Sequence, residues 1–183
     1  MTGLPLVVLD ACVLVNASLC DTLLRLAEPP RLFEPKWSEE ILRETLRTLE
    51  GKLGWPQSLL RHFESELRTH FSEAWITGYE HLIADVANDA KDRHVLAAAA
   101  HVKAPILLTF NLRHFRPEQV APWGITALHP QQFLLALYRQ EPKRVLQSLE
   151  LQAMDRKRSI GQLLAILQTT VPEFVAAIPE NVR

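Results

Sequence analysis

The sequence predicts an α/β fold with a central parallel sheet. Two short apolar runs without polar alternation, Leu6–Leu9 and Pro105–Thr109, are typical of strands buried on both faces, and Gly124–Leu128 is a third candidate strand. Segments with helical signals separate these runs. Strands that alternate with helices favour a parallel sheet covered by helices. In such sheets, binding sites form beyond the carboxyl ends of the strands.

The segments between the strands carry start and stop signals of helices. A helix is expected at 21–27, where Pro29 and Pro30 end it. Ser38 is a suitable N-cap for the next helix, because two acids follow it and an apolar face continues to Leu49. The remaining expected elements are a short strand at 75–76 and helices at 56–71, 93–102 and 130–138.

The chain has 183 residues, which fits one domain with a short appendage. After Glu141 the pattern is helical throughout, without a long linker, a repeat or a low-complexity stretch. We therefore expect residues 1–140 to form the α/β domain. Residues 141–183 are expected to form a helical extension packed on it.

Composition limits the classes of protein to which the chain can belong. The formal net charge of −1 excludes a surface that is basic throughout, so contact with nucleic acid would need a local basic patch. The apolar start lacks a basic n-region and contains Asp10, and there is no run of 18 apolar residues. Cys12 and Cys20 have neither CxxC nor zinc spacing. We expect a soluble cytoplasmic protein, not bound to a membrane, with reduced thiols.

Three carboxylates are candidates to meet at one edge of the predicted sheet. Asp10 follows the first strand, Asp92 directly precedes the helix at 93–102, and Glu44 lies on the helix after Ser38. Taken singly, the two aspartates could be N-caps and Glu44 an exposed side chain, and Asp89 competes with Asp92. As a group they repel one another unless a cation lies between them, and hard cations such as Mg²⁺ and Mn²⁺ prefer oxygen ligands.

Other chemistries have weaker support. The sequence contains no GxxxxGK[ST], GxGxxG, HExxH or GxSxG motif. His94 and His114 lie near the candidate acids, but an exposed or core histidine is the simpler interpretation of each. Basic residues near the acids could contact the phosphates of a nucleic acid, although ordinary surface charge explains any one of them equally well. The candidates for such contacts are Lys36, Arg43, Arg47, Arg93 and Arg113.

Four motifs in order resemble those of PIN domains. VVLDACVLVNA resembles the first strand with its aspartate, and WSEEILRETLRTL resembles the helix that supplies a glutamate. DAKDRHVLAAAA followed by PILLTFNLRHF resembles the third acidic position and the next strand and turn. The match runs from about Leu6 to about Leu137 and implies a three-layer α/β/α domain. Within the family, the chain is most similar to VapC-type toxin ribonucleases with a helical C-terminal extension.

This resemblance implies a metal-dependent endoribonuclease of a type II toxin–antitoxin pair. It implies Mg²⁺ or Mn²⁺ as cofactor, RNA as substrate, and cleavage that leaves a 3′-hydroxyl and a 5′-phosphate. The catalytic and metal-binding roles fall on Asp10, Glu44 and Asp92, and Asn111 would orient a ligand water. The expected partner is a VapB-type antitoxin, and a homodimer is left open.

The chain departs from the family pattern at three positions. Asn111 replaces a frequent fourth acid, His114 replaces a frequent aspartate, and Cys12 replaces a serine or asparagine. The Asn111 departure leaves a non-catalytic RNA-binding PIN module as the alternative function. A phosphoacceptor receiver domain is disfavoured, because the sequence lacks its acidic pair beside the first strand and its lysine after a later strand.

Overall fold

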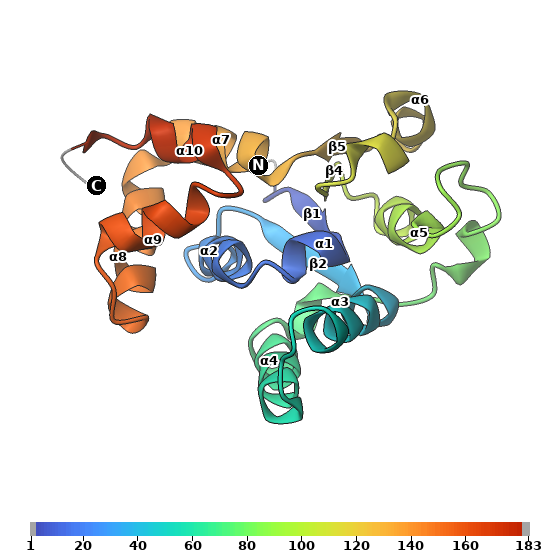
Figure 1. Cartoon of the computed structure of the whole chain (residues 1–183). Helices are drawn as coiled ribbons and strands as arrows, with labels where there is room; N and C mark the ends of the chain where they lie inside the picture. The colour runs from blue at the N-terminus through green and yellow to red at the C-terminus, as the bar shows by residue number, and fades with distance from the viewer. Residues whose placement is uncertain (1–2, 181–183) are drawn as a thin grey trace.

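The computed structural model describes residues 3–180 and has a five-stranded parallel sheet flanked by helices (Figure 1). All neighbouring strands pair in parallel, in the order β3-β2-β1-β4-β5. The strands are β1 Leu6–Leu9, β2 Glu34–Ser38, β3 Trp75–Ile76, β4 Ile106–Leu108 and β5 Thr126–Leu128. The predicted α/β class and parallel sheet are confirmed.

The helices follow the strands along the chain. The α-helices are α1 Ala11–Leu14, α2 Ala17–Ala27, α3 Glu39–Gly51, α4 Gln57–His70, α5 Arg93–His101, α6 Pro117–Val120, α7 Pro130–Gln140, α8 Pro142–Asp155, α9 Ile160–Leu167 and α10 Pro172–Ala177. Short 3₁₀ turns are η1 Ser72–Ala74, η2 Glu80–Leu82, η3 Leu112–His114 and η4 Ala121–Trp123. Within residues 3–180, no helix combines the length and the apolarity needed to cross a membrane.

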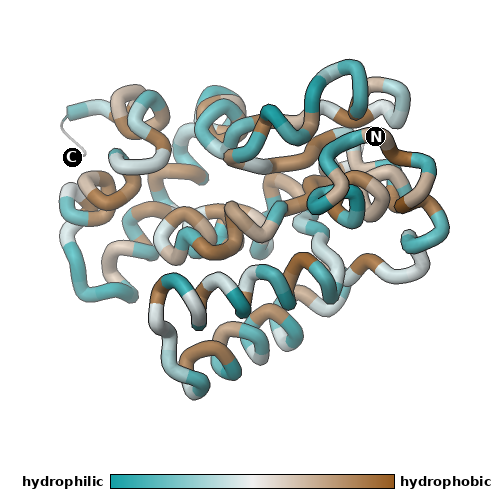
Figure 2. Tube along the Cα trace, turned by 45° about the vertical axis from the view of Figure 1, so that its right-hand side comes forward, coloured by the Kyte–Doolittle hydropathy of each residue, from teal (hydrophilic) through white to brown (hydrophobic). Residues whose placement is uncertain are grey.

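The core centres on β1, the middle strand of the sheet. Val7, Val8 and Leu9 are fully buried, as expected for a strand covered on both faces. The alanines at 97–99 of α5 are also fully buried, and this helix contacts β1, β2 and β4. Small side chains let a helix approach a sheet closely. Figure 2 shows the hydrophobic stretches gathered toward the interior of the molecule.

Two caps fix the starts of the helices that follow β1 and β2. The Oγ of Ser38 accepts a hydrogen bond from the Ile41 amide at 3.3 Å, so the predicted cap of α3 is confirmed. The expected start of α2 at Asp21 is wrong. Asn16 caps this helix through its Oδ1, which accepts from the Leu19 amide, and α2 therefore begins at Ala17.

The strand β2 is absent from the elements that the sequence predicts. Its sequence, EPKWS, contains proline, glutamate and lysine, which are depleted in strands. The segment nevertheless pairs with β1 on one side and with β3 on the other, with Pro35 opposite Val7. Pairing with a buried central strand outweighs local propensity here, and Trp37 becomes one of the largest fully buried side chains.

The segment from Pro142 onward packs mainly on α2 and α7, away from α5 in Figure 1. A buried polar contact fastens it, because the Thr22 hydroxyl donates to Gln152 Oε1 at 2.7 Å and Gln152 Nε2 donates to the Ser18 carbonyl at 2.9 Å. At the surface, Arg25 and Arg156 both bind Asp21. The boundary between a domain at 1–140 and an extension at 141–183 stays a prediction.

We expect Gln152→Ala to destabilise the protein by about 1–3 kcal/mol, because the buried hydrogen bonds of Gln152 with the Thr22 hydroxyl and the Ser18 carbonyl are both lost. Met154→Ala is the matched control on the same helix, since Met154 is 69% exposed and its removal should change stability by less than about 0.5 kcal/mol. Urea unfolding followed by tryptophan fluorescence and by circular dichroism measures both effects. Equal stability of the two variants would contradict the contact, and two separate transitions would contradict the predicted packing of residues 141–183 on the α/β domain.

Candidate active site

The carboxyl ends of β1 and β4 bring Asp10 and Thr109 side by side. Leu9 is in register with Leu108, and the Asp10 amide donates to the Leu108 carbonyl at 3.0 Å. Thr109 follows β4 in the same way, and its amide donates to the Leu128 carbonyl of β5. The polar side chains after these strands therefore share one edge of the sheet.

Asp10 is a buried carboxylate that accepts hydrogen bonds from one hydroxyl and one thiol. It is 3% exposed, and its Oδ2 accepts from Thr109 Oγ1 at 2.6 Å and from Cys12 Sγ at 3.1 Å. Burial raises the pKa of the Cys12 thiol to about 12, with the charge of Asp10 adding to the effect, so the thiol stays protonated and can donate. These two donors partly offset the loss of water around the carboxylate.

The pKa of Asp10 is nevertheless raised. Burial is the main cause; the contacts with Thr109 and Cys12 oppose it, and the negative charges of Asp92 and Glu44 add to it. Asp92 and Glu44 are thus both close enough to Asp10 to act on its carboxylate electrostatically. The three carboxylates do not by themselves surround a cation in this structure. Asp10 and Glu44 lie outside the tightest cluster of metal-binding side chains in residues 3–180.

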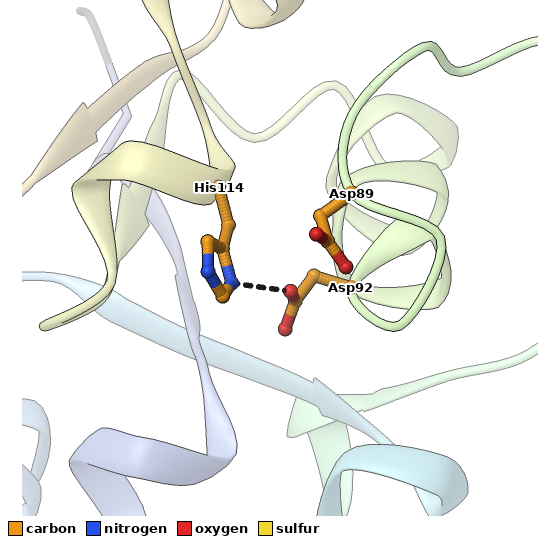
Figure 3. A group of neighbouring side chains, drawn as sticks. All are labelled: Asp89, Asp92 and His114. Atoms are coloured by element: carbon orange, nitrogen blue, oxygen red, sulfur yellow. Dashed lines mark hydrogen bonds and ion pairs between the residues drawn. The ribbon is translucent and has the colours of Figure 1, made fainter.

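That tightest cluster consists of Asp89, Asp92 and His114, whose ligand atoms lie within 4.8 Å of one another (Figure 3). Asp92 sits directly before α5, and its Oδ2 lies 2.8 Å from Nδ1 of His114 on η3. Arg113 Nε donates to the other ring nitrogen of His114 at 3.1 Å. With Nε2 as acceptor, Nδ1 carries the hydrogen and donates to Asp92.

Glu44 reaches the same region from α3. Its Oε2 lies 3.6 Å from Nε2 of His94, which is the second residue of α5. Glu44 is half-exposed, whereas His94 is 8% exposed. The contact with His94 lowers the pKa of Glu44 despite partial burial, and the charges of Arg47 and Lys52 act in the same direction. Glu44 is therefore an anion at neutral pH.

The simpler interpretation of the two aspartates, as helix caps, fails in the structure. Asp10 and Asp92 both occupy N-cap positions, yet neither side chain makes a capping hydrogen bond. The same holds for Asn111 at the N-cap of η3, whose backbone rather than side chain bonds Thr109 and His114. All three side chains remain available for another role at the sheet edge.

The basic candidates have different surroundings. Arg113 contacts His114, Arg93 follows Asp92 and donates to the Asn88 carbonyl, and Arg47 acts on Glu44. The positive charge of Arg43 helps to lower the pKa of Glu39 at the start of α3. Lys36 lies within β2 and donates to the Glu73 carbonyl at 2.6 Å. Contact of these residues with RNA stays a prediction.

A wide groove lies elsewhere on the molecule. It has a volume of about 650 Å³ and is bordered by α2, α4 and α8, with Leu24, Phe63 and Gln152 among its lining residues. None of Asp10, Glu44 and Asp92 lines it. The chemistry of the side chains, rather than the size of a hollow, therefore locates the candidate active site at the sheet edge.

Comparison with known proteins agrees with the architecture. The sequence profile of the PIN domain matches residues 6–113, which span β1, Asp10, α3, Asp92, α5, β4 and most of η3. The chain belongs to the PIN domain family. The predicted membership is thereby confirmed, and the acidic edge of the sheet corresponds to the region where the sequence resembles the acidic motifs of PIN domains.

A relative in Mycobacterium tuberculosis, named "Putative ribonuclease VapC50", is 37% identical to this PIN protein over 133 residues. The match covers 71% of this chain and 77% of the relative. No solved structure matches significantly. The similarity to VapC-type members that the sequence predicts is confirmed.

Sequence reasoning missed the histidines and Thr109. It treated His94 and His114 as exposed or core side chains, whereas each contacts one of the predicted acids. Thr109 was assigned only to the end of a strand, although it makes the shortest contact with Asp10. The available signal was position: Thr109 is the first polar residue after β4, and His94 lies two residues after Asp92.

We expect Asp10→Asn to stabilise the metal-free protein at pH 7 by on the order of 1 kcal/mol. Asparagine can still accept from Thr109 but carries no buried charge. Because the folded pKa of Asp10 is raised, its charge costs stability above that pKa and nothing in acid, where both states are protonated. The gain should therefore shrink as pH falls.

Thermal unfolding in EDTA between pH 4 and 8 measures this effect. Asp85→Asn, at an exposed aspartate in the loop before Asp92, is the control and should leave stability nearly unchanged. An Asp10→Asn protein less stable than wild type at pH 7 would contradict the free-energy cost assigned to the buried charge of Asp10.

Proposed function

We propose that this PIN protein is a metal-dependent endoribonuclease in which Asp10, Glu44 and Asp92 hold a divalent cation. The observation that carries the proposal is the buried, charge-repelled carboxylate of Asp10, which has no capping role and faces the fields of the other two acids. A protein gains nothing in stability from such an arrangement. A cation among the acids would remove the repulsion.

The donor set fits Mg²⁺ or Mn²⁺. Carboxylate oxygens are ligands of both ions, and water can complete the shell where protein atoms are too distant. A buried nitrogen without a hydrogen-bond partner, Nε2 of His94, faces the same region. A bound cation would lower the pKa of a water and neutralise charge on a phosphodiester oxygen.

The residues around the acids position them. Thr109 holds Asp10, and His114 holds Asp92 while Arg113 fixes the ring. The amide of Asn111 can accept from or donate to a water at the strand end. Arg47, Arg93 and Arg113 would bind RNA phosphates and keep the scissile bond at the acidic edge.

We expect RNA cleavage that requires Mg²⁺ or Mn²⁺ and stops with EDTA. Asp10→Asn and Asp92→Asn should each reduce the rate by at least about 100-fold, because a ligand charge is lost while the fold persists. Gel analysis of a labelled RNA measures the cleavage, and Asp85→Asn serves as the charge-matched control with wild-type activity.

Two outcomes would contradict this function. Undiminished cleavage by either variant, after contaminating nuclease has been excluded, would remove the catalytic role of that aspartate. RNA binding without any cleavage in Mn²⁺ would favour a non-catalytic RNA-binding module instead, the alternative that the uncharged Asn111 supports.

Asn111 allows a graded test of the same site. Asn111→Asp adds a fourth carboxylate and should tighten Mn²⁺ binding by about tenfold, which equals roughly 1.4 kcal/mol. The metal concentration for half-maximal cleavage should fall accordingly. Asn111→Ala should weaken binding but leave some activity, since the three acids remain. Calorimetry measures the affinities; equal values for wild type and Asn111→Asp would make Asn111 a turn residue only.

We further propose that the protein is the toxin of a toxin–antitoxin pair, acting on cellular RNA in the cytoplasm. An antitoxin of the VapB type would insert an arginine among the carboxylates, since guanidinium and carboxylate groups pair strongly. Strong expression of the chain alone should arrest bacterial growth, and Asp10→Asn should relieve the arrest. Normal growth with soluble, folded wild-type protein would argue against a toxin. A homodimer stays a prediction.

A further inference from the structure

His94 carries a buried nitrogen with no hydrogen-bond partner. The residue is 8% exposed, and its Nε2 is one of five buried side-chain polar atoms that lack a partner among residues 3–180. Buried polar atoms in proteins almost always have a partner, so an exception beside an acidic site calls for an explanation. The helix that carries His94 packs on three strands of the sheet.

The distance from this nitrogen to Glu44 can be compared with that of a hydrogen bond and with that of two ligands on one cation. Nε2 lies 3.6 Å from Glu44 Oε2, longer than the roughly 2.7–3.2 Å of an N–H···O hydrogen bond. Two ligands at about 2.1 Å from one cation lie about 3.0–3.5 Å apart for bond angles between octahedral and tetrahedral. The observed separation is therefore closer to that of two ligands of one ion than to a hydrogen bond.

The charges around His94 also favour a cation. The carboxylates of Glu40, Glu44 and Asp10 all lie close enough to His94 to act on its ring electrostatically. Three carboxylates thus act on this one ring. Glu40 additionally accepts from the Tyr79 hydroxyl at 3.4 Å, which leaves Glu44 as the acid that faces Nε2.

His114 provides the contrast. Its Nδ1 is bonded to Asp92 and its Nε2 to Arg113, so both ring nitrogens have protein partners. It lies beside acids, as His94 does, but it has no free nitrogen for a cation unless those contacts break.

We propose that Nε2 of His94 is a ligand of the catalytic cation together with Glu44, an inference that rests on the proposed metal-dependent function. An imidazole ligand disfavours Mg²⁺, which demands oxygen ligands, and favours divalent transition-metal ions. The site therefore prefers Mn²⁺ to Mg²⁺. Glu44 and His94 supply the direct bonds, and Asp10 supplies negative charge.

Mn²⁺ bound to the full-length protein tests the proposal by pulsed electron paramagnetic resonance, which detects nitrogen bonded to manganese. Wild type should show ¹⁴N coupling, and wild type grown with ¹⁵N-histidine should show ¹⁵N coupling instead, with no substitution needed. His94→Gln should lose the coupling. His114→Gln is the matched control and should keep it.

Calorimetry gives a second readout. The ratio of Mn²⁺ to Mg²⁺ affinity should fall by about tenfold in His94→Gln and stay unchanged in His62→Gln, which alters an exposed histidine of α4. If His94→Gln does not fold by circular dichroism, His94→Asn carries the test.

Bound Mn²⁺ without nitrogen coupling in wild type would overturn the role of His94. Coupling that persists in His94→Gln, or that disappears only in His114→Gln, would do the same. Metal-dependent RNA cleavage in either case would leave the proposed function standing. A wild-type protein that binds no Mn²⁺ and cleaves no RNA would overturn both.

Discussion

The burial of the Asp10 carboxylate is the constraint on which the site depends. Asp10 lies at the end of the central strand, where water is excluded and two further acids add negative potential. Two donors, Thr109 and Cys12, keep the carboxylate in place without neutralising it. The result is a carboxylate whose charged form is costly to the empty protein and attractive to a cation. The rest of the fold offsets the free-energy cost of burying this carboxylate.

The parallel sheet explains why these groups meet. Because β1 and β4 are neighbours in register, the residues after them, Asp10 and Thr109, must lie side by side. The helices α3 and α5 contact each other, which sets Glu44 against His94. The short turn η3 then sets His114 against Asp92. Asp10 and Asp92 are thus each held by a side chain from another element, so their positions are set before any ligand arrives.

Much of the fold and the identity of the acids could be predicted from sequence. The apolar runs at β1 and β4 identify buried strands, and polar residues directly after them mark the functional edge. β2 could not be found this way, because Pro35 and Lys36 contradict strand propensity and only pairing with β1 makes the segment a strand. Local rules are overridden where tertiary contacts dominate.

The partners of the acids were harder to predict than the acids. His94 and Glu44 are separated by 50 positions, and nothing in their local patterns records that α3 and α5 meet. The hydroxyl of Thr109 has the same limitation, since its value comes from the register of two strands distant in sequence. Asn111 was recognised as a departure from the family pattern, and the structure adds that its side chain makes no capping bond.

The most direct test of the central claim is anomalous diffraction from crystals soaked in Mn²⁺. The account predicts a manganese peak between Asp10, Glu44 and Asp92, within direct or single-water reach of all three carboxylates. A peak confined to Asp89, Asp92 and His114, remote from Asp10 and Glu44, would contradict it. No peak at saturating Mn²⁺ would contradict it as well.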